Sequence, residues 1–122
     1  MNEQSFNAAL RVGIAALLAQ LILQLLWHAW LVPTSRAALA LAVLPLVPGL
    51  WIALYNVRRG LLVGAIASLL YFCHGCAELL SATQAPWLAA AEVAFALVLI
   101  AALYGDARSG RRRGRARRPS HE

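Results

Sequence analysis

Residues 61–80 read LLVGAIASLLYFCHGCAELL, an apolar run in which Glu78 is the single acidic residue and no basic Arg or Lys occurs. A helix rises 1.5 Å per residue, so about 20 such residues cross a bilayer core about 30 Å thick. The run has almost none of the polar residues at helical period that mark the exposed face of a soluble helix. It therefore predicts a membrane-spanning helix.

Three further apolar runs lie on either side of it, at residues 9–32, 37–55 and 87–104. Hydrophobic residues make up 61% of the chain, above the roughly 45–50% of soluble domains. The loops are too short for an extramembrane domain. We predict an all-α, four-span transmembrane bundle as one domain over residues 1–107, followed by a disordered polybasic tail over residues 108–122.

Arginine predicts the orientation of this bundle. Four spans place both termini on one side, together with Arg11, Arg58, Arg59 and the tail, whereas Arg36 lies on the opposite side. Positively charged residues remain in the cytoplasm, so both termini are expected there. The tail should contact anionic lipid headgroups through Arg108, Arg111, Arg112, Arg113, Arg115, Arg117 and Arg118. We expect no nucleic acid partner, because the tail has no aromatic residues and no folded domain that could recognise nucleic acid.

Several residues predict where helices begin, bend and pack. Ser35 can cap the second helix and Pro86 can begin the fourth. Pro45 and Pro48 predict a kink near the middle of the second helix.

The third helix carries small residues along one face, which predicts either that it is the central helix or that this face forms a homodimer seam. These residues are Gly60, Gly64, Ser68 and Gly75.

Polar residues inside the spans are costly in lipid and should face the bundle interior. In the first span Gln20, Gln24 and His28 stand at i, i+4 and i+8, on one helix face. His74 and Glu78 share a face of the third span, and the fourth span carries Glu92. The predicted topology places the four titratable side chains in the outer half of the membrane; they are His28, His74, Glu78 and Glu92. The predicted intramembrane polar cluster comprises Gln24, His28, His74, Glu78 and Glu92.

This polar cluster allows three interpretations. It can be a hydrogen-bonded knot that specifies helix pairing. It can be a proton or metal site, with His28, His74, Glu78 and Glu92 as candidate ligands, although the pattern commits to no metal. It can also recognise a ligand such as a lipid headgroup or a quinone.

Cys73 and Cys76 form a C-x-x-C motif around His74 and Gly75. Such a motif suggests thioredoxin-like redox chemistry near a βαβ pattern, but here it lies inside a predicted span. Buried cysteine commonly behaves as a small apolar residue, so an inert pair is favoured over a metal site with His74.

Residues 24–28 (QLLWH), residues 71–78 (YFCHGCAE) and Glu92 together resemble a bacterial family of small inner-membrane proteins, domain-of-unknown-function 2069. The resemblance covers roughly residues 9–104. It implies a four-span protein of the bacterial inner membrane and carries no assigned activity. The two cysteines and the Arg-rich tail lie outside the family pattern, which argues against a redox role.

The sequence favours a non-enzymatic accessory or scaffold protein that packs against other membrane components or a second copy. It contains no nucleotide fingerprint or phosphate loop, and no cofactor is expected. One rival is an ion- or metal-linked carrier that uses the His and Glu side chains. A second rival is a membrane redox or quinone-linked protein.

Overall fold

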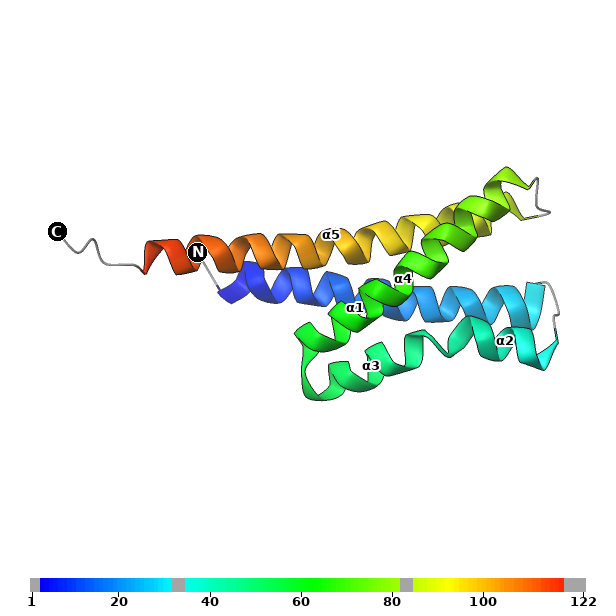
Figure 1. Cartoon of the computed structure of the whole chain (residues 1–122), viewed down its shortest axis with the longest axis horizontal. Coiled ribbons are helices and arrows are strands. Elements are labelled where there is room, and N and C mark those ends of the chain that lie inside the picture. Colours follow the sequence, from blue (N-terminus) through cyan, green and yellow to red (C-terminus); the bar gives the residue numbers. More distant parts are fainter. Residues whose placement is uncertain (1–2, 32–34, 82–84, 118–122) are drawn as a thin grey trace.

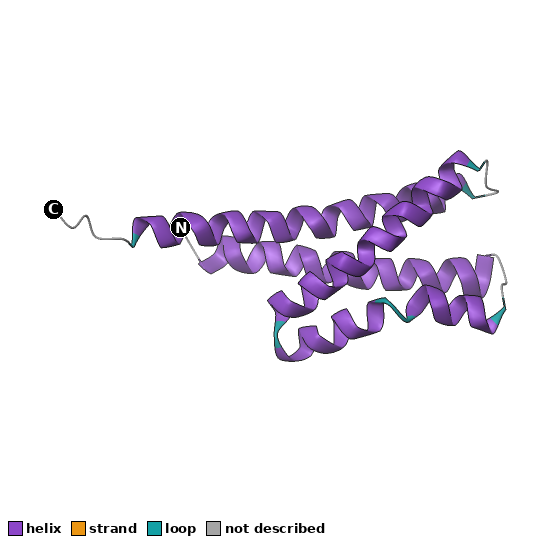
Figure 2. Ribbon diagram, in the orientation of Figure 1, coloured by secondary structure: helices purple, strands orange, loops and turns teal. Residues whose placement is uncertain are grey.

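The structure is a computed structural model that describes residues 3–31, 35–81 and 85–117. Within these ranges every secondary-structure element is a helix, joined by short loops (Figure 2). The all-α prediction is therefore confirmed. The elements are α1 (Glu3–Leu25), the π-helix η1 (Leu26–Leu31), α2 (Arg36–Val43), α3 (Leu46–Tyr55), α4 (Val57–Leu80) and α5 (Pro86–Ala116).

Three helices in the described part of the chain are long and apolar enough to cross a membrane by themselves. They are α1 continued by η1, then α4, then α5. Helices α2 and α3 are bent by 40° at a short break and make a fourth crossing if the pair is one span. Figure 1 shows α4 crossing obliquely between the α2–α3 pair and α5, with the first turn of α1 and the C-terminal part of α5 at the same end.

The break between α2 and α3 has the predicted proline cause. The amide of Leu44 donates to the Ala40 carbonyl at 2.8 Å, but Pro45 has no N–H with which to continue the ladder. Beyond it, Val47 donates to Leu44 at 3.3 Å instead of completing a regular α turn. The C-terminal carbonyls of α2 therefore lack part of their helical donors. The hydroxyl of Tyr71 on α4 donates to one of them, the Ala42 carbonyl, at 2.5 Å.

Two predicted helix boundaries are confirmed. The Ser35 hydroxyl accepts from the Ala38 amide at 3.3 Å and caps α2, and Pro86 is the first residue of α5. Val32, the predicted last residue of the first span, lies outside the described residues, as does Arg118 of the tail.

The tail differs from the expected disordered segment, because α5 continues as helix through Ala116. Arg and Ala are good helix formers, and a helix that already spans the bilayer needs no new nucleus to extend. Arginines near its C-terminal end also interact favourably with the helix dipole. A Cβ added at Gly110 or Gly114 would meet no atom within 4 Å, so the helix surface is open at these two positions.

Helix α4 has the largest buried share of the three long spans, 39% against 33% for α1 and 28% for α5. Its small residues face different neighbours: Gly60 meets Ala53 of α3, and Gly64 meets Leu17 of α1. Because the chain itself covers this face, the face is not available as a homodimer seam. The alternative of a central helix fits the packing.

Buried apolar side chains form two groups along the bundle. The larger one surrounds Leu17, Leu61 and Leu99, and the smaller one surrounds Trp27 and Leu88. Gln20 on α1 and Glu92 on α5 come between these two groups along their helices. The other buried polar residues of the described chain are Gln24, Ser68 and Asp106. Most large apolar side chains on the outside remain exposed, as expected for a bundle whose solvent is lipid.

Candidate functional site

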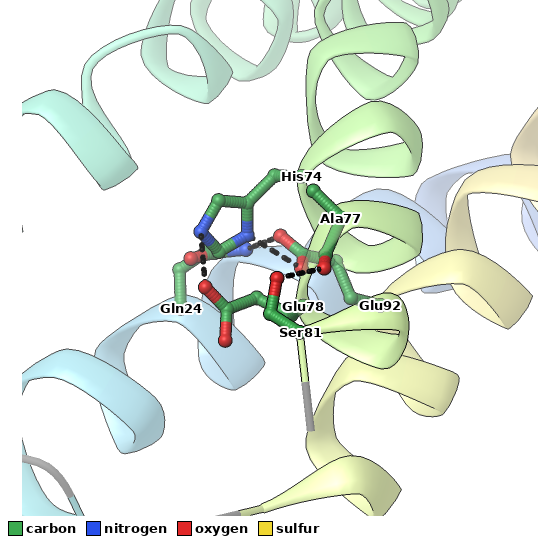
Figure 3. Close-up of polar contacts among 6 residues, drawn as sticks. All are labelled: Gln24, His74, Ala77, Glu78, Ser81 and Glu92. Atoms are coloured by element: carbon green, nitrogen blue, oxygen red, sulfur yellow. Dashed lines mark hydrogen bonds and ion pairs between the residues drawn. The ribbon is translucent and has the colours of Figure 1, made fainter. Parts of the chain in front are cut away.

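The site centres on Glu92, which lies in the second turn of α5 and is 0% exposed. Its Oε1 accepts from the side-chain amide of Gln24 on α1. Its Oε2 lies 3.0 Å from Nδ1 of His74 on α4. Figure 3 shows the three side chains converging from three helices. We call Gln24, His74 and Glu92 the Glu92 junction, because one carboxylate connects α1, α4 and α5.

A glycine beside His74 allows α5 to approach α4 at this level. A Cβ on Gly75 would lie 3.0 Å from the Ala89 carbonyl oxygen and 2.9 Å from Cγ2 of Val93. It would also lie 3.3 Å from Oε2 of Glu92 itself. The close approach that places Glu92 against His74 therefore requires a residue without a side chain at this position.

His28 joins the site through ring contacts. It stacks on Trp27, with ring centroids 5.8 Å apart and planes 7° apart. Trp27 in turn lies 5.7 Å from the His74 ring, and the two imidazole rings are 6.4 Å apart. Trp27 is only 5% exposed and packs inside the bundle. Both residues lie in the π-helix η1, a rare geometry that changes which residues share a face and that often occurs at functional sites.

Glu78 lies at the margin of the site. Its Oε1 is 3.9 Å from Nε2 of His74, beyond hydrogen-bonding distance, and its side chain is 35% exposed. Of the five residues of the predicted cluster, the structure thus joins three by direct contact, adds His28 through its ring, and leaves Glu78 outside the junction.

A cleft of about 340 Å³ opens beside the junction, between the break in α2–α3 and α4. Its apolar walls include Leu41 and Leu70, which are 71% and 63% exposed and therefore stand at its mouth. The remaining apolar lining is Ala38, Ala42 and Pro45, and the polar lining is Gln24, His28, Tyr71, His74 and Glu92. We call it the α2–α4 cleft.

Two fully buried polar side chains lie about one turn further from the junction, toward the end of the bundle where α4 begins. Gln20 is 1% exposed and Ser68 is 0% exposed, and their side-chain polar atoms have no hydrogen-bond partner among the described residues. Leu17 contacts Gly64, and Gln20 and Ser68 follow these residues by one turn on parallel helices. Gln20 and Ser68 therefore lie at similar heights along the contact between α1 and α4.

The cysteines are free thiols, with Cys73 exposed and Cys76 partly buried. Within residues 3–31, 35–81 and 85–117, no three His, Cys, Asp or Glu side chains are placed to hold one metal ion. The geometry gives no support to the metal candidates His28, His74, Glu78 and Glu92.

Sequence reasoning missed two polar contacts. One is the bond from Tyr71 to the α2 break, which no spacing rule signals. The other is an ion pair near the start of α4, where Arg58 Nε lies 3.2 Å from Oδ2 of Asp106. A lone acidic residue next to an Arg-rich segment could have signalled the second contact.

A family comparison agrees with this architecture. The profile of the DUF2069 family, described as predicted membrane proteins, matches residues 12–111. The chain belongs to the DUF2069 family. The matched region contains the Glu92 junction, the α2–α4 cleft and the Arg58–Asp106 pair. Neither a curated protein nor a solved structure is similar enough to give a match.

Proposed function

We propose that this DUF2069 protein is a non-enzymatic accessory or scaffold protein of the bacterial inner membrane. The Glu92 junction carries this proposal. Both oxygens of its fully buried carboxylate are engaged by side chains of two other helices. A carboxylate used in this way fixes how α1, α4 and α5 pack, and the packed bundle then presents a defined apolar surface to other membrane components.

Both termini are assigned to the cytoplasm in this proposal. In the described chain Arg36 begins α2 at one end of the bundle, whereas the other arginines lie in the first half of α1, at the start of α4 and in the last third of α5. Figure 1 shows those three segments toward the opposite end. That partition supports a cytoplasmic location for the Arg-rich end.

The Arg-rich extension of α5 is assigned to anionic lipid headgroups. This segment continues as helix to Ala116, and its arginines are exposed. Basic residues near an anionic leaflet each contribute about 1 kcal/mol, and salt screens this attraction.

Reporter fusions and native gels test the proposal together. A fusion between Ser81 and Ala85 should report the periplasm, and a fusion after Gly105 should report the cytoplasm. On native gels of gently solubilised membranes, the protein should migrate in a discrete assembly with one reproducible partner or a second copy. Glu92→Gln should dissociate that assembly, and Cys73→Ala should leave it intact.

A periplasmic C-terminus would contradict the topology. A protein that migrates as a lone 13.2 kDa chain and conducts ions when reconstituted would contradict the scaffold role. That second result would favour the ion-linked carrier.

A further inference from the structure

The α2–α4 cleft has the composition of a site for a small molecule that arrives through the membrane. Binding sites of this kind are typically 300–1,000 Å³, mostly apolar, with few polar groups, and often lie between the helices of a bundle. This cleft has a volume of about 340 Å³ and places its polar lining at the Glu92 junction. Its mouth lies between exposed Leu41 and Leu70, on a surface that faces lipid.

The charges around the cleft disfavour a ligand whose polar head group is anionic. No arginine is among the described residues that line it, whereas Glu92 is. The C-terminal end of α2, with the carbonyl of Ala42, also faces this region, and a helix C-terminus carries a partial negative charge. A phosphate or carboxylate placed here would therefore be repelled.

A cationic head is disfavoured for a different reason. Gln24 and His74 already engage both oxygens of Glu92. Glu78 does not line the cleft, so no second carboxylate is present there to balance a new positive charge. Moving an unpaired cation from water against leucine side chains is costly.

The remaining hydrogen-bonding capacity of the cleft includes an acceptor on His74. In the neutral tautomer whose Nδ1–H donates to the Glu92 carboxylate, the lone pair of the His74 ring lies on Nε2, and the proposal below requires this form. Nε2 is 3.9 Å from Glu78, too far for a hydrogen bond, and the His74 side chain is 44% exposed. A hydroxyl group in the cleft can donate to this nitrogen.

We propose that the α2–α4 cleft binds a neutral, membrane-soluble molecule with a hydroxyl-bearing head. The head donates to Nε2 of His74, and the apolar tail leaves between Leu41 and Leu70. Quinols and isoprenoid alcohols share this chemistry. Binding requires no electron transfer, and it can occur whether or not the protein assembles with partners.

Thermal unfolding of the protein in phosphatidylcholine nanodiscs tests this binding, because a ligand that binds the folded state raises its unfolding temperature. The probes are decylubiquinol, its oxidised form decylubiquinone, farnesol and phosphatidylglycerol. Decylubiquinol should give a saturable rise, and decylubiquinone a smaller one because it lacks the hydroxyl donors. An equal rise with farnesol means that the hydroxyl suffices, and no rise with farnesol means that the ring is also recognised; both results support the site.

Two matched pairs of variants locate the site. Leu70→Trp should lower the affinity for decylubiquinol at least about tenfold, equivalent to about 1.4 kcal/mol. Leu69→Trp, which is next to it and exposed but outside the cleft, should have no effect. Ala38→Phe fills the cleft from α2, and Ala40→Phe is its exposed control.

Three results would overturn the proposal. One is the same saturable response in Leu70→Trp and Ala38→Phe as in their controls, provided that all four variants unfold cooperatively without ligand. Another is a response to decylubiquinone or phosphatidylglycerol as strong as that to decylubiquinol. The third is no saturable response to either hydroxyl probe.

Discussion

Two carboxylates attach α5 to α4, one at each end of the bundle, in opposite surroundings. Glu92 is 0% exposed, and both of its oxygens have partners, from α1 and α4. The Asp106 side chain is 9% exposed, and its partner, Arg58, is 55% exposed. The Glu92 junction is a contact within the protein interior, whereas the Arg58–Asp106 pair lies at the boundary of the bundle.

This difference shows how lipid changes the use of a carboxylate. Inside the bundle, water cannot satisfy a polar group, so each oxygen of Glu92 requires a side chain with fixed geometry. At the other end of the bundle Arg58 is more than half exposed, and an exposed ion pair contributes little. Substitutions at the junction should therefore cost more stability than substitutions at the pair.

Gly75→Ala should give the largest effect, because its Cβ would press on the α5 backbone and on Glu92. We expect a loss of about 2 kcal/mol in the free energy of unfolding in detergent, as for other over-packed interiors. The control is Gly110→Ala, because a Cβ at Gly110 would meet no atom within 4 Å. This substitution should be neutral or slightly stabilising, since alanine favours helix. Equal losses at both positions would mean that α5 does not pack closely at Gly75.

Glu92→Gln should cost about 1–2 kcal/mol, because the amide keeps the side-chain volume but weakens the contacts with Gln24 and His74. Glu78→Gln makes the same chemical change at a partly exposed site and should stay within about 0.5 kcal/mol of wild type. Denaturant titration of the purified protein measures both. A larger loss of stability from Glu78→Gln than from Glu92→Gln would mean that Glu78, and not Glu92, is the central carboxylate of the cluster.

Asp106→Asn should cost less, at most about 1 kcal/mol, because Arg58 is more than half exposed. The cost should shrink as salt is added, since salt screens exposed charges. Arg58→Gln should give a similar loss, and Arg59→Gln serves as the neighbouring control. An effect as large and as insensitive to salt as that of Glu92→Gln would remove the contrast between the two ends.

Removing the residues after Gly110 should have the smallest effect on stability. Residues 110–117 are exposed, and a Cβ at Gly110 or Gly114 would meet no atom within 4 Å, so thermal unfolding in detergent without anionic lipid should not change. Binding to vesicles that contain phosphatidylglycerol should weaken, most clearly at low salt. A lower unfolding temperature after truncation would show that the extension packs against the bundle.

The fold could be predicted from the sequence because a segment that crosses lipid has to be a long, apolar helix. Apolar length locates the crossings, and the missing N–H of Pro45 locates the break. The extended helix at the C-terminus was not predicted, because the absence of an apolar period was taken as evidence for disorder. An arginine-rich segment that continues an existing span needs no apolar face to stay helical.

The site was predicted less completely, because spacing along one helix does not fix the rotation of that helix against its neighbours. The spacing places His74 and Glu78 on one face, but only the packing around Gly75 shows that His74 turns toward Glu92. Trp27 follows Gln20 and Gln24 at helical spacing on the buried face of the first span, so its burial continues a regular pattern.

A double-mutant cycle between Gln24 and Glu92 tests the junction most directly. Gln24→Leu, Glu92→Gln and the double variant are unfolded in the same detergent, and the interaction energy is taken from the three losses. The junction predicts a coupling of about 1 kcal/mol or more between Gln24 and Glu92, and a value within about 0.3 kcal/mol of zero between Gln24 and Glu78. Additive losses for Gln24 and Glu92, or a larger coupling with Glu78, would contradict a single buried carboxylate that connects α1, α4 and α5.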